Sequence, residues 1–381
     1  MLESIFRGSS RYLAWVGFLL FFIAVAGLVY WNQVKSGLGV TGLNQDVLWG
    51  LYISQLNFWV GVAASAVAVV VPYYLHDQKA FGKAIVVGES LAISACLMCL
   101  LFVWVDIGQP GRIVYVLLYA SPKSIMFWDA VALAGYLLIN AVLVRSSLVA
   151  EQNCTALPSW FRPIAYVSIP WAIGIHTVTA FLYAGLSARY LWNTAILAPR
   201  FLASAFASGP SLLVLLLYAL KKFAKHDVDE GSILTLARII TYCTLANVFF
   251  VGVEVFTAFY GGIQHHTAAF AYLFENSSSL APWLWASALM TAIALVLLIA
   301  PQTRNNLAVL PWACVLVAAS VWLDKGLGMV IAGFVPNAYG HTPEYCPTMP
   351  EAAVSVGICA FGLLITTFMC KIIVNVRERA Q

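Results

Sequence analysis

Four ionisable side chains lie within long apolar stretches of this sequence: Glu89, Asp129, His176 and Glu254. Ionisable groups are rare inside membrane-spanning segments, where each is a functional hypothesis by default. Asp129 and His176 are expected on neighbouring spans, in the middle to outer part of the membrane. A carboxyl group that exchanges a proton and an imidazole that forms a hydrogen bond suit the two-electron, two-proton chemistry of a quinone. The alternative is that these groups only form interhelical hydrogen bonds.

The same four residues are expected at graded depths. Glu89 is placed near the inner face, His176 near the middle, and Asp129 and Glu254 toward the outside. This order predicts a proton relay from the inner face to the quinone, with waters or hydroxyl groups between its members. For Glu89 the competing interpretation is a hydrogen bond to a neighbouring helix.

A second group of residues near the outer surface is expected to line the quinone-binding slot. The aromatic members also fit the aromatic belt at a membrane interface, and the two polar members before the second apolar run also fit helix caps. The candidates are Asn44, Asp46, Trp49, Tyr52, Trp128, Glu254 and Tyr260.

The sequence contains few residues that could bind a redox cofactor. Its eight cysteines are scattered, and the one close pair, Cys96 and Cys99, has no second pair to complete an iron–sulfur site. Among six histidines only His176 lies deep in an apolar run, whereas a transmembrane haem b needs two facing ligands. The sequence therefore predicts no haem, no iron–sulfur cluster and no metal site, so electrons must come from a partner.

Composition sets the class of protein. Of the 381 residues, 62% are hydrophobic and 9% are charged, against roughly 25% charged in an ordinary soluble domain. This composition excludes a soluble globular protein. A net charge of +4 is too small to indicate a basic surface that binds nucleic acid. Lipid leaves no partner for unpaired backbone groups, so the spans must be helices.

The long apolar runs predict an all-α, polytopic membrane protein with about ten transmembrane helices in a single domain. The expected spans are residues 12–31, 47–75, 84–105, 124–144, 163–187, 200–221, 232–260, 281–301, 307–323 and 351–374.

The distribution of positive charge predicts orientation. With ten spans both termini lie on one side, and most of the 20 Lys and Arg residues fall on that side. By the positive-inside rule, both termini are expected in the cytoplasm, with the protein in the cytoplasmic (inner) membrane among its lipids. The exceptions, expected on the outer side, are Lys35, Arg112, Lys123, Arg189, Arg200 and Lys325.

Three outer loops, residues 32–46, 106–123 and 324–350, are rich in turn-forming and aromatic residues and carry few charges. This composition suits the core of a protein interface better than a solvated surface. We expect these loops to form the docking face for an extrinsic redox partner.

Several short segments carry a resemblance to a known family. Its signature stretches are similar to residues 39–53 (GVTGLNQDVLWGLYI), 105–112 (VDIGQPGR) and 121–129 (SPKSIMFWD). The protein resembles the NrfD/PsrC family of membrane subunits over nearly its whole length. Within it, the sequence is most similar to the ten-helix DsrP-type branch, with HmcC-type subunits next, in residues 176–181 (HTVTAF), 193–201 (NTAILAPRF), 324–329 (DKGLGM) and 333–336 (GFVP).

The resemblance implies two four-helix bundles with the first and last helices peripheral. It also implies electron exchange between menaquinone and an iron–sulfur subunit docked on the outer face, in dissimilatory sulfur metabolism. The implied partners are a ferredoxin-like iron–sulfur subunit of the DsrO type, a multihaem cytochrome c of the DsrJ type, a haem b membrane subunit of the DsrM type and a cytoplasmic subunit of the DsrK type.

Two other classes remain open. A secondary transporter would also contain ten helices and buried carboxylates, although helices interrupted by Gly or Pro in matching halves are not evident here. A purely structural anchor would hold redox subunits without touching quinone, and would tolerate replacement of Asp129 and His176.

Overall fold

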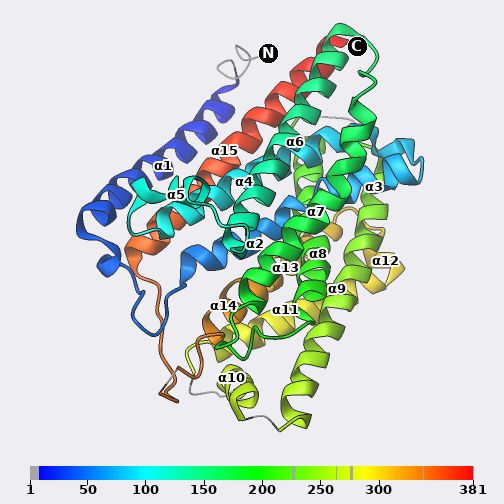
Figure 1. Cartoon of the computed structure of the whole chain (residues 1–381). Helices are drawn as coiled ribbons and strands as arrows, with labels where there is room; N and C mark the ends of the chain where they lie inside the picture. The colour runs from blue at the N-terminus through cyan, green and yellow to red at the C-terminus, as the bar shows by residue number, and fades with distance from the viewer. Residues whose placement is uncertain (1–7, 225–227, 263, 275–277, 338, 381) are drawn as a thin grey trace.

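The computed structural model describes residues 8–224, 228–262, 264–274, 278–337 and 339–380. Within these ranges the protein is a bundle of long helices with no β-strand (Figure 1). Ten segments are long and apolar enough to cross a membrane, which confirms the predicted class. They are α1 (Ser10–Ser36), α2 with α3 (Leu51–Ala63, Val67–Leu75), α4 (Gly82–Asp106), α6 (Ile125–Asn153), α7 (Phe161–Ala184), α8 (Leu197–Phe223), α9 (Glu230–Tyr260), α11 (Ala281–Ile299), α13 with η5 and α14 (Leu310–Val321, Trp322–Gly328, Met329–Ala332) and α15 (Met349–Ala380).

The remaining elements are short and lie in the connections. They are the 3₁₀ turns η2 (Leu38–Val40), η3 (Lys79–Phe81) and η4 (Pro110–Arg112), and the helices α5 (Tyr115–Leu118), α10 (Gln264–Phe274) and α12 (Pro301–Arg304).

The long helices form two four-helix bundles. In the first, α4 packs against α2 and α6, while α7 packs against α6 and closes on α2 and α3. In the second, α8 and α9 pack together, as do α11 and α13, and α13 closes on α8. Helices α1 and α15 pack on each other, and α15 covers α4 at the edge of the first bundle (Figure 1).

The two bundles meet closely where α2 crosses α8. A Cβ atom on Gly209 would lie 3.0 Å from the backbone nitrogen of Ser65, and one on Gly61 would lie 3.3 Å from Ser208 Oγ. At this crossing the backbone turns between α2 and α3, where Ser65 N bonds to Val62 O. Small residues therefore allow the bundles to share one junction, which α7 and η5 also border.

The ninth span is longer than the sequence indicated. Residues 307–323 were expected to cross the membrane, with Asp324 and Lys325 in an outer loop, but the helix continues to Ala332 through the π-helical segment η5. Lys325 is 3% exposed and Arg200 is 7% exposed. Two charges assigned to the outer surface therefore lie inside the protein, because Arg200 is paired with carboxylates and Lys325 rests on an aromatic ring.

The fourth span also continues past its expected end at residue 144, to Asn153. The added turns carry Glu151, whose carboxylate accepts a hydrogen bond from Arg377 Nε on α15 at 3.1 Å. This contact with the last helix stabilises an extension that hydropathy alone does not indicate.

Candidate functional site

A cluster of polar side chains lies at the junction of the two bundles. His176, Thr179 and Tyr183 occupy one face of α7, at intervals of three and four residues, and all three are fully buried. Asp129 on α6 faces this stripe, since the Thr179 hydroxyl lies 2.6 Å from Asp129 Oδ1 and 2.8 Å from the carbonyl oxygen of Ile175. The structure thus brings the two predicted catalytic residues, Asp129 and His176, to neighbouring turns of two packed helices.

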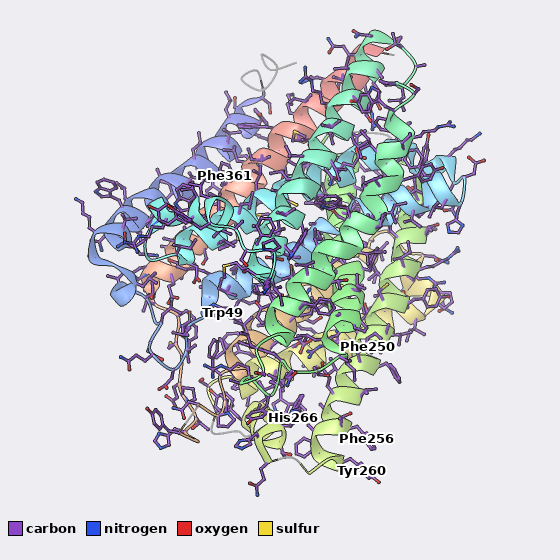
Figure 2. All side chains as sticks on the ribbon, in the orientation of Figure 1. Trp49, Phe250, Phe256, Tyr260, His266 and Phe361 are labelled. Atoms are coloured by element: carbon purple, nitrogen blue, oxygen red, sulfur yellow. The ribbon has the colours of Figure 1, made fainter. Side chains whose placement is uncertain are left out.

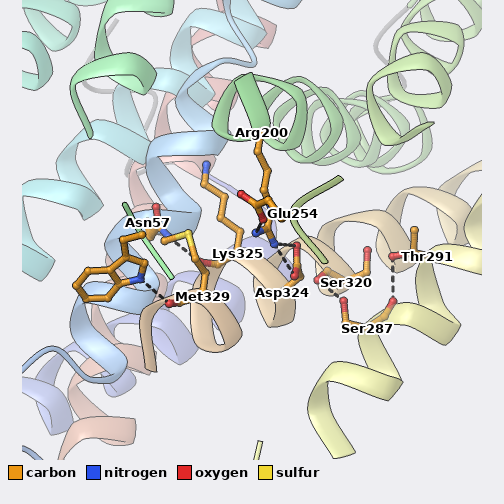
Figure 3. Close-up of polar contacts among 10 residues, drawn as sticks. Asn57, Arg200, Glu254, Ser287, Thr291, Ser320, Asp324, Lys325 and Met329 are labelled. Carbon is orange, nitrogen blue, oxygen red and sulfur yellow. Dashed lines mark hydrogen bonds and ion pairs between the residues drawn. The ribbon is translucent and has the colours of Figure 1, made fainter. Parts of the chain in front are cut away.

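Lys325 approaches the same cluster from η5, on the other side of the junction. Its Nζ lies 4.1 Å from the centroid of the Phe201 ring, and it interacts electrostatically with His176 and Cys99. Its carbonyl oxygen accepts a 2.6 Å hydrogen bond from Asn57 Nδ2 (Figure 3). Lys325 therefore adds a buried amino group that was not among the predicted site residues.

The polar atoms of this cluster are unusual because most have no protein partner. Both ring nitrogens of His176, Nζ of Lys325 and the hydroxyl oxygen of Tyr183 have no hydrogen-bond partner among the described residues. Buried polar groups are nearly always hydrogen-bonded, since an unsatisfied group costs about 1–3 kcal/mol. The cluster is therefore suited to bind a polar ligand or water.

Aromatic rings form the outer wall of the cluster. The ring of Trp49 lies 5.3 Å from that of Tyr183 and 5.4 Å from that of Trp192. Tyr183 in turn lies 5.9 Å from Phe201, the ring beneath Lys325, and Trp192 lies 5.2 Å from Phe334. Trp49 is partly exposed while Tyr183 and Trp192 are buried, so the wall leads from the surface to the polar cluster.

This arrangement supplies the elements that a planar redox ring requires. Asp129 can exchange a proton, the His176 imidazole can donate or accept a hydrogen bond, and Lys325 can offset negative charge on a ring oxygen. The aromatic wall provides apolar faces for stacking. We call the set Asp129, His176, Thr179, Tyr183, Lys325 and Trp49 the junction site.

Three other predicted members lie near the predicted docking loops. Tyr52 is fully buried, but its hydroxyl donates to Gln33 Oε1 at 2.7 Å and so contacts α1. Asn44 is exposed, and its Oδ1 accepts from the backbone nitrogens of Asp46 and Val47 at 2.9 and 2.8 Å. Asp46 Oδ1 accepts from Asn337 Nδ2 at 3.1 Å. These contacts order the loop before α2, which begins only at Leu51.

Two predicted aromatic members face outward. Trp128 is 49% exposed, and its indole nitrogen donates to the carbonyl oxygen of Pro122 at 2.8 Å. Tyr260 is 82% exposed and stacks on Phe256 at the end of α9. Figure 2 shows both rings of this pair directed away from the bundle. Their positions fit an aromatic belt better than the wall of a buried slot.

Glu254 belongs to a separate cluster in the second bundle. Its carboxylate forms an ion pair with Arg200, whose other terminal nitrogen lies 2.8 Å from both carboxylate oxygens of Asp324. Sequence reasoning missed this triad because its members are 54 and 124 residues apart. One signal was present: the apolar stretch from Leu310 continues to Phe334, interrupted only by the charged pair at 324–325.

Glu89 lies toward the opposite end of the first bundle from the aromatic wall. It is completely buried, and neither carboxylate oxygen has a hydrogen-bond partner among the described residues. A cavity of about 330 Å³ is lined by Tyr74, Ile85 and Glu151. Ile85 lies one helical turn before Glu89, and Tyr74 interacts electrostatically with it. The cavity therefore approaches Glu89 from the start of α4 and the end of α6.

The three predicted docking loops lie on one side of the molecule and contact one another. Gly42 N donates to Glu351 at 2.8 Å, and the hydroxyl of Tyr345 donates to the same carboxylate at 2.8 Å. Burial, and then the Glu351 charge, raise the pKa of Tyr345 above its ordinary value, so its hydroxyl keeps the proton that it donates. A Cβ atom on Gly108 would lie 3.3 Å from the side chain of Leu38, so loop 106–123 contacts loop 32–46.

No group of three or more His, Cys, Asp or Glu side chains that could hold a metal ion occurs within the described part of the protein. All cysteines that the structure describes are free thiols.

Comparison with known proteins identifies relatives along most of the sequence. The model of the family "Polysulphide reductase, NrfD" matches residues 39–335, from the loop before α2 to the end of the ninth span. The peripheral helices α1 and α15 lie outside that range.

Three curated proteins illustrate the similarity. The Hdr-like menaquinol oxidoreductase integral membrane subunit of Archaeoglobus fulgidus is 23% identical, covering 94% of this chain and 92% of that protein. The menaquinone reductase integral membrane subunit of Nitratidesulfovibrio vulgaris is 21% identical, covering 93% and 90%. A polysulfide reductase subunit of Wolinella succinogenes is 26% identical, covering 67% and 84%.

Proposed function

The protein belongs to the polysulphide reductase NrfD family, and we propose that it is the quinone-interacting membrane subunit of a respiratory oxidoreductase complex. The observation that carries this proposal is the junction site, where His176, Lys325 and Tyr183 present buried polar atoms without protein partners among the described residues. Two relatives are named for menaquinol and menaquinone, which supports menaquinone as the quinone.

In the proposed reaction, bound menaquinone or menaquinol accepts or supplies two electrons together with two protons. Asp129 exchanges a proton with a ring oxygen, and Thr179 holds its carboxyl group in place through the 2.6 Å contact. His176 forms a hydrogen bond to the ring, and Lys325 offsets negative charge there. The aromatic wall, with Trp49 at its outer end, orients the ring and excludes water.

Electrons are proposed to pass between the site and an iron–sulfur subunit docked on the outer loops. Its resemblance to the DsrP-type branch supports the proposal that this complex belongs to dissimilatory sulfur metabolism. Its partners would be a ferredoxin-like iron–sulfur subunit, a multihaem cytochrome c, a haem b membrane subunit and a cytoplasmic subunit. The charge distribution supports an orientation in the cytoplasmic membrane with both termini inside.

Protons are proposed to enter from the inner side. The cavity beside Tyr74 and Ile85 leads toward Glu89, whose unpartnered carboxyl group begins the relay. His176 and Asp129 continue it toward the ring. Because Glu254 is bound by Arg200, we route the proposed relay through the first bundle and the junction.

The decisive experiment replaces the two central residues in the assembled complex. Asp129→Asn and His176→Ala should each lower quinone-dependent electron transfer about 100-fold, because each removes a group that exchanges a proton with the ring or binds it. Turnover is measured in both directions, with a soluble menaquinone analogue as acceptor and a soluble menaquinol analogue as donor. His76→Ala, at an exposed position in an inner loop, is the control and should leave turnover unchanged. Unchanged turnover in both site variants would instead favour the structural-anchor interpretation.

Docking can be tested separately by cross-linking. In a background in which the exposed native thiols Cys154 and Cys346 are replaced by serine, cysteines introduced at Leu48 and Tyr339, both exposed in the outer loops, should cross-link to the iron–sulfur subunit. A cysteine at Leu157, exposed in an inner loop, should not. Cross-links from position 157 alone would reverse the proposed orientation.

A further inference from the structure

A cavity of about 270 Å³ lies inside the second bundle, between α8, α9, α11 and α13. A neighbouring cavity of about 130 Å³ shares four of its lining residues, including Ala288 and Asp324. We call the two together the lateral groove. Their combined size falls within the range of about 300–1,000 Å³ that is typical of small-molecule sites.

The lateral groove opens toward lipid. Val248 on α9 and both Ala288 and Ala292 on α11 line the larger cavity, and all three are exposed on the surface of the protein. Asn247 and Thr291, which also line it, lie near the middles of α9 and α11. A molecule would therefore enter from the hydrocarbon layer and stop near its centre.

The floor of the lateral groove contains one free polar group among the described residues. The Ser287 hydroxyl donates to the carbonyl oxygen of Ser320 at 2.8 Å, and the Thr291 hydroxyl donates to that of Ser287 at 2.9 Å (Figure 3). Asp324 is bound by Arg200. Asn247 differs: it is 8% exposed, and its Oδ1 has no hydrogen-bond partner within the described structure. Its amide is thus available to a ligand.

The chemistry of that amide selects the ligand. A lipid acyl tail fits an apolar groove but offers no hydrogen-bonding group at the membrane centre. An amide both donates and accepts hydrogen bonds, so it can bind a ring carbonyl or a ring hydroxyl. We propose that the lateral groove binds a second quinone or quinol molecule, with Asn247 on a ring oxygen and the isoprenoid tail leaving between α9 and α11.

This second site is separate from the junction site. Asp324 borders the lateral groove while Lys325 points to the junction, so the two consecutive residues of η5 face different ligands (Figure 3). The proposal rests on the proposed function only for the identity of the ligand, since the shape, opening and free amide belong to the groove itself.

Photolabelling of the assembled complex in lipid nanodiscs tests the proposal, with an azido-naphthoquinone as the probe. Peptides from α9 and α11 should be labelled, in addition to peptides from α6 and α7 at the junction site. Asn247→Leu, which removes the amide, and Ala292→Trp, which fills the groove, should each lower labelling of α9 and α11 at least tenfold. Labelling at the junction should stay unchanged.

Ile293→Trp is the matched control, because Ile293 is exposed on the same helix but does not line the groove. Labelling that persists in both groove variants, or that never occurs on α9 and α11, would overturn the second site. The second site would also be overturned if excess phospholipid displaced the probe as well as excess unlabelled naphthoquinone does, because the groove would then hold an acyl tail. Labelling of α9 and α11 without α6 and α7 would contradict the junction site alone.

Discussion

Two buried cations on neighbouring elements have opposite surroundings. Arg200 on α8 is held by Glu254 and by both carboxylate oxygens of Asp324, each at 2.8 Å from its second terminal nitrogen. Lys325, the residue after Asp324, points away from that triad toward the junction, and its Nζ has no hydrogen-bond partner within the described structure (Figure 3). Both side chains are less than 10% exposed.

The difference between the surroundings of Arg200 and Lys325 distinguishes a structural role from a chemical one. A buried cation that is paired with carboxylates, as Arg200 is, needs no ligand to offset its charge, and it fixes how helices pack. The pairing leaves only Glu254 Oε1 of the two carboxylates without a hydrogen-bond partner among the described residues. A buried polar group without a partner destabilises the folded protein. Such a group is retained where it binds a ligand or transfers a proton. Burial does not make this distinction, because Glu254 and Asp129 are 7% and 6% exposed and only the first forms an ion pair among the described residues.

The largest expected effect comes from breaking the paired cluster. Arg200→Met leaves two carboxylates without their cation inside the second bundle. Removal of one partner from a buried pair typically costs about 3–5 kcal/mol, so we expect a loss of that order in the free energy of unfolding. The measurement is unfolding of the purified protein in detergent. The triple variant Arg200→Met, Glu254→Gln, Asp324→Asn should recover most of the loss, and a failure to recover would show that packing of the guanidinium dominates.

The unpaired cation should behave in the opposite way. Lys325→Met keeps the aliphatic stem and removes a charge that no carboxylate binds, so stability should stay equal or rise. Quinone-dependent turnover should fall roughly 10- to 100-fold, about 1.4–2.7 kcal/mol of activation free energy, because charge on the ring oxygen is no longer offset. Lys35→Met, on an exposed lysine in the last turn of α1, is the control. Unchanged turnover with lowered stability would make Lys325 a packing residue instead.

The fold follows from the sequence because lipid imposes length and apolarity on each span. The ten apolar runs were therefore recognisable. The largest errors concern the ends of two helices, which depend on contacts between side chains that are distant in sequence. The fourth helix continues to Asn153 where Glu151 meets Arg377, and the ninth continues to Ala332 because Asp324 is neutralised by Arg200. No local pattern reports such long-range pairs.

The site was recognisable only in part. Asp129 and His176 were evident because a charge or an imidazole in an apolar run is conspicuous. Lys325 was not, because a Lys beside an Asp near a glycine resembles a loop. Tyr183 is an ordinary aromatic residue in a span until the fold places its ring 5.3 Å from Trp49 and leaves its hydroxyl without a partner among the described residues.

The smallest expected effect sharpens the comparison between two carboxylates, Glu151, which lines the inner cavity, and Glu89, which lies one helical turn beyond its lining residue Ile85. Glu89 has no hydrogen-bond partner among the described residues, while Glu151 lines the cavity and is engaged by Arg377. Glu89→Gln preserves shape and removes only the exchangeable proton, so assembly should be intact. Because the carboxyl group delivers protons without touching the ring, turnover should fall about threefold, roughly 0.7 kcal/mol of activation free energy.

When menaquinone is the electron acceptor, proton uptake from the inner face of proteoliposomes should slow by the same factor, because reduction of the ring cannot outrun delivery of its protons. Glu151→Gln keeps the same cavity and changes only the paired carboxylate, so turnover and proton uptake should match the unmodified protein. If Glu89→Gln leaves both rates unchanged, protons reach the junction by another route, and an unpartnered carboxylate is then insufficient to mark a functional group in this bundle.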